Sequence, residues 1–550
     1  MNKTFSNAHT CFTSARLRCL LFSLVLLTAA CQQKKTETNT EKIVVRDTTI
    51  TQGNAYSDLF FDSTRLENTI QNLLLQDTIA KRLRNFYNGR NYQYAWFNTD
   101  GINEQTNIFW NLQSNYLQYS KDSTLFNPAL QKLIDSANAK DGSLSLDDST
   151  RFAAELQLTR QFVRYARRAY QGNLSMTENP GWFIPRKRIN TVALLDSFLK
   201  NKEPYAPMNP QYGLLKKFLI RYYDMQQHGG WPAINSTAKK FQVGDSAPAI
   251  GAIKRRLFTT ADFTEPDTSY VFTDSLKAAV QQFQERYGLK ADGVVGGNTL
   301  QALNEPIEQR IRQILINMER MRWMPAQPEG DFILVNIPQY KLTVFEQGQP
   351  SFNMNIVVGQ AQHETVIFTG DIKQVVFSPY WNIPPGILKN EILPAIRRNP
   401  GYLASHNMEW HNGYVRQKPG PNNALGKVKF LFPNSYNIYL HDTPARSLFG
   451  AEKRAFSHGC IRVAGPEKLA AWILRGQPEW TPEKIKKAMN QGKEQYVAVK
   501  NPVPVFIGYF TAYVDAAGQL NFRDDIYGHD QEMAARLFAK CCPNAPKFAA

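Results

Sequence analysis

The chain has 550 residues, of which 43% are hydrophobic and 20% charged. This composition excludes an intrinsically disordered protein, and the length is enough for several domains that each bury a core. The formal net charge of +17 suggests an anionic partner. The basic residues are spread along the chain and no zinc finger or RNP stretch is present, so no nucleic-acid partner is predicted. A location near an anionic cell envelope accounts for the charge equally well.

Residues 1–30 have the features of a secretory signal peptide. Lys3, Arg16 and Arg18 precede an apolar run over 20–30. A run of this length is too short to span a membrane, whereas it suits the apolar region of a signal peptide. We therefore expect export to the periplasm.

The end of this run, LTAAC, resembles a lipobox, in which a Cys after small residues is lipidated. Thr28 stands where Leu is commonest in that motif. We expect Cys31 to carry a lipid that anchors the protein to a membrane, with soluble secretion as the alternative. The polar stretch over 31–56 is predicted to be a solvated tether.

The six cysteines do not form a recognisable disulfide framework. Two lie in the signal peptide and Cys31 is the expected lipidation site, which leaves Cys460, Cys541 and Cys542. The adjacent pair near the C-terminus could bridge only with strain. We interpret that pair as ordinary thiols, and Cys460 requires a separate explanation.

Residues 57–239 are predicted to form a helical scaffold domain. Apolar residues recur at helical spacing in LENTIQNLLLQ and LLKKFLIRYY, and clusters such as YAWFN and NPGWFIP interrupt them. No catalytic pattern is visible here. The lone acids and His228 are interpreted as solvated surface groups.

Residues 240–304 are predicted to form a unit of three short helices. A helix over 273–287 would carry four apolar side chains on one face, and Gly and Asn mark the turns. The stretch resembles the peptidoglycan-binding module of cell-wall enzymes. Glycan binding and a purely structural role both stay open. The positions that match that module are Ala279, Val280, Phe283, Gln284, Gly288, Leu289, Asp292, Gly293, Gly296, Thr299 and Leu303.

A connecting helix over 305–330 precedes a mostly β domain over 331–540. The EQGQ stretch predicts a hairpin between the β-branched runs KLTVF and SFNMNIVVG. Pro, Asn and Gly break the strand pattern over about 386–430, which we interpret as a capping insertion and hypothesise to be a lid. The chain is thus predicted to be a multidomain α+β protein.

The stretch HDTPARSLFGAEKRAFSHGCIRV carries the candidate chemistry. A thiol is a strong nucleophile once it becomes a thiolate, and that requires a base or a lowered pKa. His441 ends one predicted strand and Cys460 opens the next, so the loop between them could bring the two together. The turn Ser457-His458-Gly459 could direct the backbone N–H groups of Gly459 and Cys460 at an oxyanion. These residue types suit acyl transfer.

Each residue of this stretch also has a structural interpretation. A lone Cys in a strand is usually a small core residue, and a lone His usually satisfies a hydrogen bond. A zinc site built from His441, Asp442, His458 and Cys460 is another alternative. It lacks the closely spaced ligand pairs that are typical of such sites. Together the residues favour a nucleophile and its base.

The arrangement HDT…SHGCIRV resembles the active-site motif of the L,D-transpeptidases, whose catalytic domain is of the YkuD type. The order of scaffold, peptidoglycan-binding module, catalytic domain with capping insertion, and C-terminal PVFIGYFTAYVDAAGQLNFRDDIYG is similar to the long, YcbB-like members. The resemblance covers roughly residues 57–540. The segment CIRVAGPE lacks the Asn and Asp that follow CIRM in many short members.

The resemblance implies a role for each residue of the motif. Cys460 would be the nucleophile and His441 the general base. Ser457 would orient His441 through its backbone carbonyl, while His458 and Gly459 would shape the oxyanion region.

The resemblance also implies three residues near the substrate. Arg462 would hold the loop or contact substrate. Tyr439 and Trp381 match aromatic positions that line the pocket in long members, although packing roles account for them equally well.

The implied reaction joins peptidoglycan stem peptides without a metal or organic cofactor. Cys460 would attack the bond between the diamino acid and the terminal D-alanine of a tetrapeptide, and a neighbouring stem amine would resolve the thioester into a 3-3 cross-link. Water, a D-amino acid or a protein are alternative acceptors. A thiol protease and a non-catalytic wall-binding scaffold are alternatives of other classes, and no particular protein partner is indicated.

Overall fold

The computed structural model describes residues 44–52, 57–140, 142–173, 182–184, 189–201, 208–265, 267–325 and 330–538. The predicted signal peptide, the lipidation site Cys31 and the thiols Cys541 and Cys542 lie outside these residues. Within the described ranges, no helix combines the length and the apolar character that crossing a bilayer requires. The chain divides into two compact units, Met1–Thr99 and Asp100–Ala550.

The first unit contains α2 (Ser63–Asn72) and α3 (Asp77–Asn88). Its core is aromatic, because the ring of Phe61 lies 4.9 Å from Tyr87 and 5.4 Å from Tyr94, centroid to centroid. Edge-to-face pairs of this kind add to the free energy that burial of the rings supplies. The YAWFN cluster that interrupts the helical pattern is therefore part of this core.

The second unit begins with the remaining helices of the predicted scaffold. Asn103, Asn127, Asp147 and Asn209 each cap the N-terminus of one of them, since their side chains accept backbone N–H groups of the first turn. The helical scaffold expected from the apolar spacing is confirmed. The helices are α4 (Glu104–Ser120), α5 (Pro128–Asn138), α6 (Asp148–Gln171), α7 (Thr191–Asn201) and α8 (Pro210–Gln227).

The predicted three-helix module is α9 (Pro248–Thr259), α10 (Asp274–Arg286) and α11 (Gly297–Asn304). The four apolar side chains expected on one face of α10 are all buried, namely Leu276, Ala279, Val280 and Phe283. The helix begins one residue after its N-cap, Thr273, whose side chain accepts the Leu276 N–H.

The polar residues of the module pattern hold its turns. The Gln284 side chain is buried, donates to Asp292 Oδ1 and Thr299 Oγ1 at 3.1 Å each, and accepts the Gly293 N–H at 2.8 Å. Gly293 has a φ of 72°, a conformation that favours glycine. These four matched positions therefore serve the fold of the module, whatever it binds.

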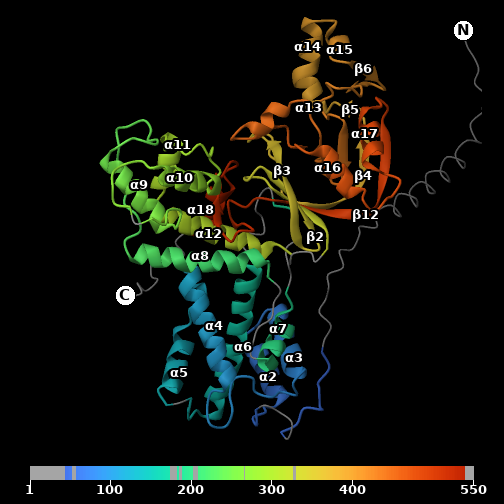
Figure 1. Ribbon diagram of the computed structural model, residues 1–550. Helices are drawn as coiled ribbons and strands as arrows, with labels where there is room; N and C mark the ends of the chain where they lie inside the picture. Colours follow the sequence, from blue (N-terminus) through green and yellow to red (C-terminus); the bar gives the residue numbers. More distant parts are fainter. Residues whose placement is uncertain are drawn as a thin grey trace, which may run out of the picture. The chain divides into compact units, whose positions relative to one another are not determined.

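Helix α12 (Ile307–Trp323) connects the module to the β domain and runs side by side with α8 (Figure 1). Arg322 of α12 is buried, pairs with Glu319 at 2.6 Å and donates to the Tyr212 hydroxyl of α8 at 2.9 Å. This ion pair and hydrogen bond compensate the free-energy cost of burying the Arg322 charge. The predicted connecting helix is thus tied to the scaffold.

Among the described residues, nine strands form one sheet in the order β10-β3-β11-β9-β8-β4-β12-β1-β2. An additional pairing of β2 with β3 closes the sheet on itself. The predicted hairpin is confirmed, because Glu346 pairs with Gln349 across the turn. The strands are β1 (Phe332–Asn336), β2 (Lys341–Glu346), β3 (Gln349–Gly359), β4 (Thr369–Phe377), β8 (Val428–Leu431), β9 (Leu440–His441), β10 (Ala455–Ser457), β11 (Ile461–Val463) and β12 (Gln495–Gly508).

The remaining elements of the domain lie outside this sheet. The C-terminal segment forms the hairpin of β13 (Ala512–Val514) and β14 (Leu520–Phe522) and then α18 (His529–Leu537), which contacts α12. Helices α16 (Pro466–Ile473) and α17 (Pro482–Asn490) pack on each other.

The segment predicted as a capping insertion has its own small core. Ile383, Ile392, Met408 and Val415 are buried against one another. The segment includes one strand before residue 386 and ends before β8 begins at Val428. Its elements are β5 (Trp381–Asn382), α13 (Pro385–Ile387), the π-helical turn η3 (Leu388–Ile392), α14 (Leu393–Arg398), α15 (Tyr402–Ser405), β6 (Met408–His411) and β7 (Tyr414–Gln417).

Candidate active site

Two short parallel strands, β9 and β11, bring four of the predicted site residues to one face of the sheet. Arg462 pairs with His441, and one step earlier the Ile461 N–H donates to the Tyr439 carbonyl at 3.1 Å. Side chains of paired residues point to the same side and alternate along a strand. Cys460 and Arg462 therefore share a face with Tyr439 and His441.

Cys460 is a free thiol that is partly exposed. Its Sγ lies 3.5 Å from the backbone carbonyl of Asn437. Burial raises the pKa of the Cys460 thiol, whereas Tyr439 and the charge of Arg462 act in the opposite direction. The resting side chain is thus a protonated thiol, and a base has to remove its proton before it can attack a carbonyl.

His441 is buried, with 4% of its surface exposed. Burial and the nearby charge of Arg462 lower the pKa of His441 to about 3, and the Asp442 carbonyl opposes this only in part. The imidazole is therefore neutral at pH 7. Its Nδ1 lies 2.5 Å from the Asp442 carbonyl oxygen, an acceptor, so Nδ1 carries the hydrogen and Nε2 keeps the free lone pair.

The partner of His441 differs from the predicted one. The Ser457 carbonyl was expected to orient the ring, but it accepts the backbone N–H of Gln360 at 3.0 Å, and the Asp442 carbonyl meets the ring instead. In the described part of the chain, no hydrogen bond joins Cys460 Sγ to the His441 ring. The two residues share a face of the neighbouring strands β9 and β11.

The turn before Cys460 is held by its own serine. Ser457 is buried, and its Oγ donates to the Cys460 carbonyl at 2.6 Å and accepts the Gly459 N–H at 3.1 Å. The expectation that the Gly459 N–H faces an oxyanion is therefore not met, because this N–H is used within the turn. Gly459 has a φ of 107°, which favours glycine at this position.

The side chain of His458 extends from this turn to the capping insertion. Its Nε2 is 3.3 Å from Glu391 Oε1 in η3, and its ring stacks on His363 with the centroids 4.9 Å apart. Its side chain is 43% exposed, in contrast to the buried His441. The two histidines of the motif thus occupy different environments, and His458 links the turn to the insertion.

Arg462 and Trp381, both expected near substrate, differ in placement. Arg462 Nε is buried without a hydrogen-bond partner among the described residues. Burial lowers the pKa of the Arg462 guanidinium and the nearby thiol of Cys460 opposes this. Trp381 packs against the small core of the insertion. Arg462 therefore belongs to the Cys460 face, and Trp381 belongs to the insertion.

Two residues that support the turn were missed in the sequence. The Thr365 hydroxyl donates to the Gly459 carbonyl at 2.8 Å, and the Tyr527 hydroxyl donates to the Gly359 carbonyl at 2.6 Å. Thr365 belongs to no motif or periodic pattern, and Tyr527 lies in the C-terminal stretch ending in DDIYG, for which no site role was predicted. Within the described ranges, no three His, Cys, Asp or Glu side chains gather in a group that could hold a metal ion.

Three family models match separate parts of the chain. Residues 330–504 match the model described as "L,D-transpeptidase catalytic domain", residues 81–219 match "Scaffold domain", and residues 246–303 match "Putative peptidoglycan binding domain". A Haemophilus influenzae protein named "Putative L,D-transpeptidase" is 32% identical over 243 residues, which are 40% of this chain and 49% of that protein. The chain thus spans about half the length of this curated relative.

Solved structures give a weaker likeness. The L,D-transpeptidase of Xylanimonas cellulosilytica (residues 123-326) is 15% identical, covers 50% of this chain and 100% of its own, and has a TM-score of 0.17. The L,D-transpeptidase (Yku) of Stackebrandtia nassauensis is also 15% identical, covers 50% and 98% respectively, and has a TM-score of 0.22.

The family models confirm the resemblance found in HDT…SHGCIRV and in the module pattern. The scaffold and module matches lie within the predicted ranges 57–239 and 240–304. The chain therefore combines a scaffold domain and a peptidoglycan-binding-like module with a segment, residues 330–504, that matches the L,D-transpeptidase catalytic domain.

Proposed function

We propose that this protein is a cell-wall L,D-transpeptidase that makes 3-3 cross-links between peptidoglycan stem peptides. The observation that carries the proposal is the placement of Cys460 and the neutral His441 on one face of β9 and β11. The match to a peptidoglycan-binding module supports the wall as the substrate. An envelope location with lipidated Cys31 is part of the same proposal and is supported by the signal-like N-terminal sequence.

In the first half of the reaction, Nε2 of His441 accepts the Cys460 proton. The thiolate attacks the carbonyl carbon that joins the diamino acid to the terminal D-alanine. The C–N bond breaks as the proton returns from His441 to the leaving amine, so D-alanine departs and a thioester remains.

In the second half, the side-chain amine of a neighbouring stem attacks the thioester carbonyl. His441 takes the proton that this amine loses, and the C–S bond breaks to restore the Cys460 thiol. The thioester keeps enough bond energy for the second transfer without an added energy source.

Arg462 contributes a charge on the same face. A cation close to Cys460 favours the thiolate, and it disfavours a second positive charge on His441. The imidazolium is therefore stabilised only while the thiolate or the oxyanion is present. This restricts proton transfer to the reacting complex.

The experiment that tests the proposal is mass spectrometry of the products from purified disaccharide tetrapeptides, with Cys460→Ala as the control. A dimer lighter than two monomers by one D-alanine, absent from the control, is the expected product. Tripeptide without dimer would identify hydrolysis as the reaction. Substrate left unchanged by the reduced protein would contradict the proposal and favour a wall-binding scaffold.

A further inference from the structure

A cavity of about 1080 Å³ lies between the peptidoglycan-binding-like module and the catalytic domain. The module, α12, the β1–β2 turn, the loop before β10 and the segment after β14 all line it. Cys460 is not among the lining residues. Asn355 lines the cavity from β3, and Gly359, four residues further along the same strand, pairs with Ser457. The cavity and the turn before Cys460 are thus about 13 Å apart along the strand.

Seven cationic side chains line this cavity, and three of them, Lys341, Arg454 and Arg523, come from separate segments of the catalytic domain. In the described part of the chain, none of these three forms an ion pair. Their polar contacts go to neutral oxygens, namely Lys341 Nζ to Asn353 Oδ1 at 3.5 Å, Arg454 Nη1 to the Ala451 carbonyl at 2.7 Å, and Arg523 Nη1 to the Arg286 carbonyl at 2.6 Å. Arg454 Nε is buried without a partner among these residues.

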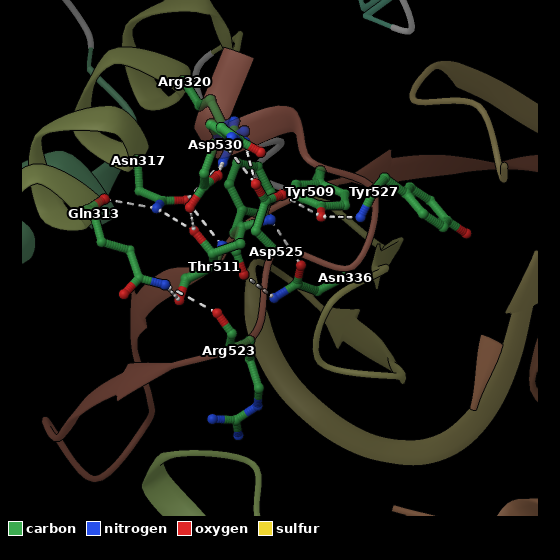
Figure 2. Close-up of polar contacts among 12 residues, drawn as sticks. Gln313, Asn317, Arg320, Asn336, Tyr509, Thr511, Arg523, Asp525, Tyr527 and Asp530 are labelled. Carbon is green, nitrogen blue, oxygen red and sulfur yellow. Dashed lines mark hydrogen bonds and ion pairs between the residues drawn. The ribbon is translucent and has the colours of Figure 1, made fainter. Parts of the chain in front are cut away.

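Three of the five carboxylates that line the cavity contact groups other than Lys341, Arg454 and Arg523. Asp530 pairs with Arg320 at 2.5 Å, Asp525 accepts the Tyr509 hydroxyl at 2.7 Å, and Asp524 lies 3.7 Å from Lys453. In Figure 2 the Arg523 guanidinium points away from the network of Asp525 and Asp530. With seven cationic side chains against five carboxylates, the lining of the cavity carries an excess of positive charge.

The three charges act on one another at an energetic cost. Burial, Arg454 and Arg523 together lower the pKa of Lys341. Burial lowers the pKa of Arg454, with Arg523 adding to the effect and Tyr340 opposing it. A bound anion would relieve this repulsion, as nearby opposite charge does for any cluster of like charges.

The cavity wall is held in place before any ligand binds. Arg286 of the module donates to the Leu520 carbonyl at 2.5 Å and pairs with Asp262 at 2.6 Å. Gln313 of α12 donates to the Arg523 carbonyl at 2.9 Å (Figure 2). A β-carbon at Gly288 would lie 2.7 Å from Cδ of Arg523, so the matched glycine of the module permits this close approach. Such preorganisation lowers the entropic cost of binding.

We propose that this cavity is a second substrate site, in which Lys341, Arg454 and Arg523 bind the carboxylates of a peptidoglycan stem peptide. The choice of a stem peptide rests on the proposed function, since such peptides carry several carboxylates along a short chain. The cavity volume suits a ligand of that size better than a single small anion. Guanidinium and ammonium groups bind carboxylates through charge-assisted hydrogen bonds.

The test measures binding by calorimetry to the full chain carrying Cys460→Ala, which prevents turnover. The probes are a purified disaccharide tetrapeptide and the same compound with its carboxylates amidated. We expect Arg454→Gln with Arg523→Gln to weaken binding of the acidic probe about tenfold or more, the loss of one or more charge-assisted hydrogen bonds. The matched control is Arg160→Gln, at an exposed position of α6.

A single substitution tests the same site with less risk that the variant fails to fold. Lys341→Gln removes a side chain with one long contact, and we expect it to weaken binding about threefold to tenfold. Hydrogen exchange should slow over 450–454 and 522–525 when the acidic probe is added. Equal affinity of parent and variants, or equal binding of the amidated probe, would overturn the proposal.

The outcomes separate this inference from the proposed function. Loss of binding in the cavity variants without cross-linked product from the intact enzyme would leave the anion site standing and remove the transpeptidase assignment. Cross-linked product together with unchanged binding in the variants would support the transpeptidase assignment and overturn the anion site.

Discussion

The hydroxyl of Thr365 donates a hydrogen bond to the backbone carbonyl of Gly459, 2.8 Å away. The hydroxyl oxygen of Thr365 also accepts the backbone N–H of Gly359 at 2.9 Å. One buried side chain therefore joins the end of β3 to the residue before the candidate nucleophile. It fixes the Gly459 peptide on which the direction of Cys460 depends.

Replacing Thr365 by Val should misplace the nucleophile while keeping the size of the side chain. The change leaves a buried N–H and a buried carbonyl without their partner, which costs about 1–3 kcal/mol in unfolding free energy. We expect kcat to fall more than the affinity for substrate changes. Thr343→Val in β2 is the control, and equal kcat values for the two variants would contradict a positioning role for Thr365.

The two histidines of the motif should differ sharply in their contribution to acylation. General bases contribute about 100-fold to 10,000-fold, so His441→Ala should slow thioester formation by that order. His458→Ala should have a much smaller effect, because His458 is half exposed and contacts the insertion. Rapid-quench mass spectrometry measures the rates, with Cys460→Ser as the blank. Similar losses in both variants would mean that the base assignment is wrong.

Stability should depend on pH through His441. Its pKa in the fold is about 3 against an ordinary value of 6.5, so the unfolded chain binds a proton that the folded chain rejects. This contribution to stability is fully present above pH 6.5 and is lost as pH falls toward 3, at about 1.4 kcal/mol per pH unit.

Thermal unfolding at pH 7.5 and at pH 4.5 checks this slope. We expect His441→Asn to lose less stability than the parent between these two values, whatever its stability at neutral pH. The exposed His228 supplies the control variant, His228→Asn. A pH slope that is identical in His441→Asn and in the parent would exclude the buried neutral imidazole.

Removing the charge of Arg462 should make the thiol less reactive. Arg462 lowers the pKa of Cys460, so Arg462→Gln should raise that pKa. The pH profile of Cys460 alkylation by iodoacetamide should then shift to higher pH, whereas Arg160→Gln should not move it. An unshifted profile in Arg462→Gln would show that the guanidinium does not act on the thiol.

The lid hypothesis for the capping insertion can be tested by shortening it. Because the insertion has its own core, a Gly-Ser linker in place of 386–427 should leave the main sheet folded. We expect turnover to fall, because a lid that closes over the site holds the substrate in place and excludes water. Circular dichroism checks the fold, and unchanged turnover would refute the hypothesis.

Individual helices and turns could be predicted from the sequence, because the residue patterns that specify them lie within one element. The apolar face of α10, its start after Thr273 and the turn between β2 and β3 depend on the spacing of residues within one element. Cys460 and His441 could be predicted as nucleophile and base for the same reason, since HDT and SHGC are contiguous motifs. Both motifs lie within residues 330–504, the range of the catalytic-domain match.

The tertiary structure alone decided which groups meet. β9 lies beside β11 although β10 precedes β11 in the chain, and that strand pairing gives Arg462 its place beside His441. The Asp442 carbonyl on the His441 ring and the use of the Gly459 N–H by Ser457 depend on a few ångströms of backbone placement.

The cavity lined by Lys341, Arg454 and Arg523 is the clearest case of a feature that only the fold creates. Lys341, Arg454 and Arg523 are far apart in the sequence and share no motif. Strand pairing and helix packing bring such segments together, because burial of apolar surface across the whole domain selects one arrangement that residue spacing cannot encode.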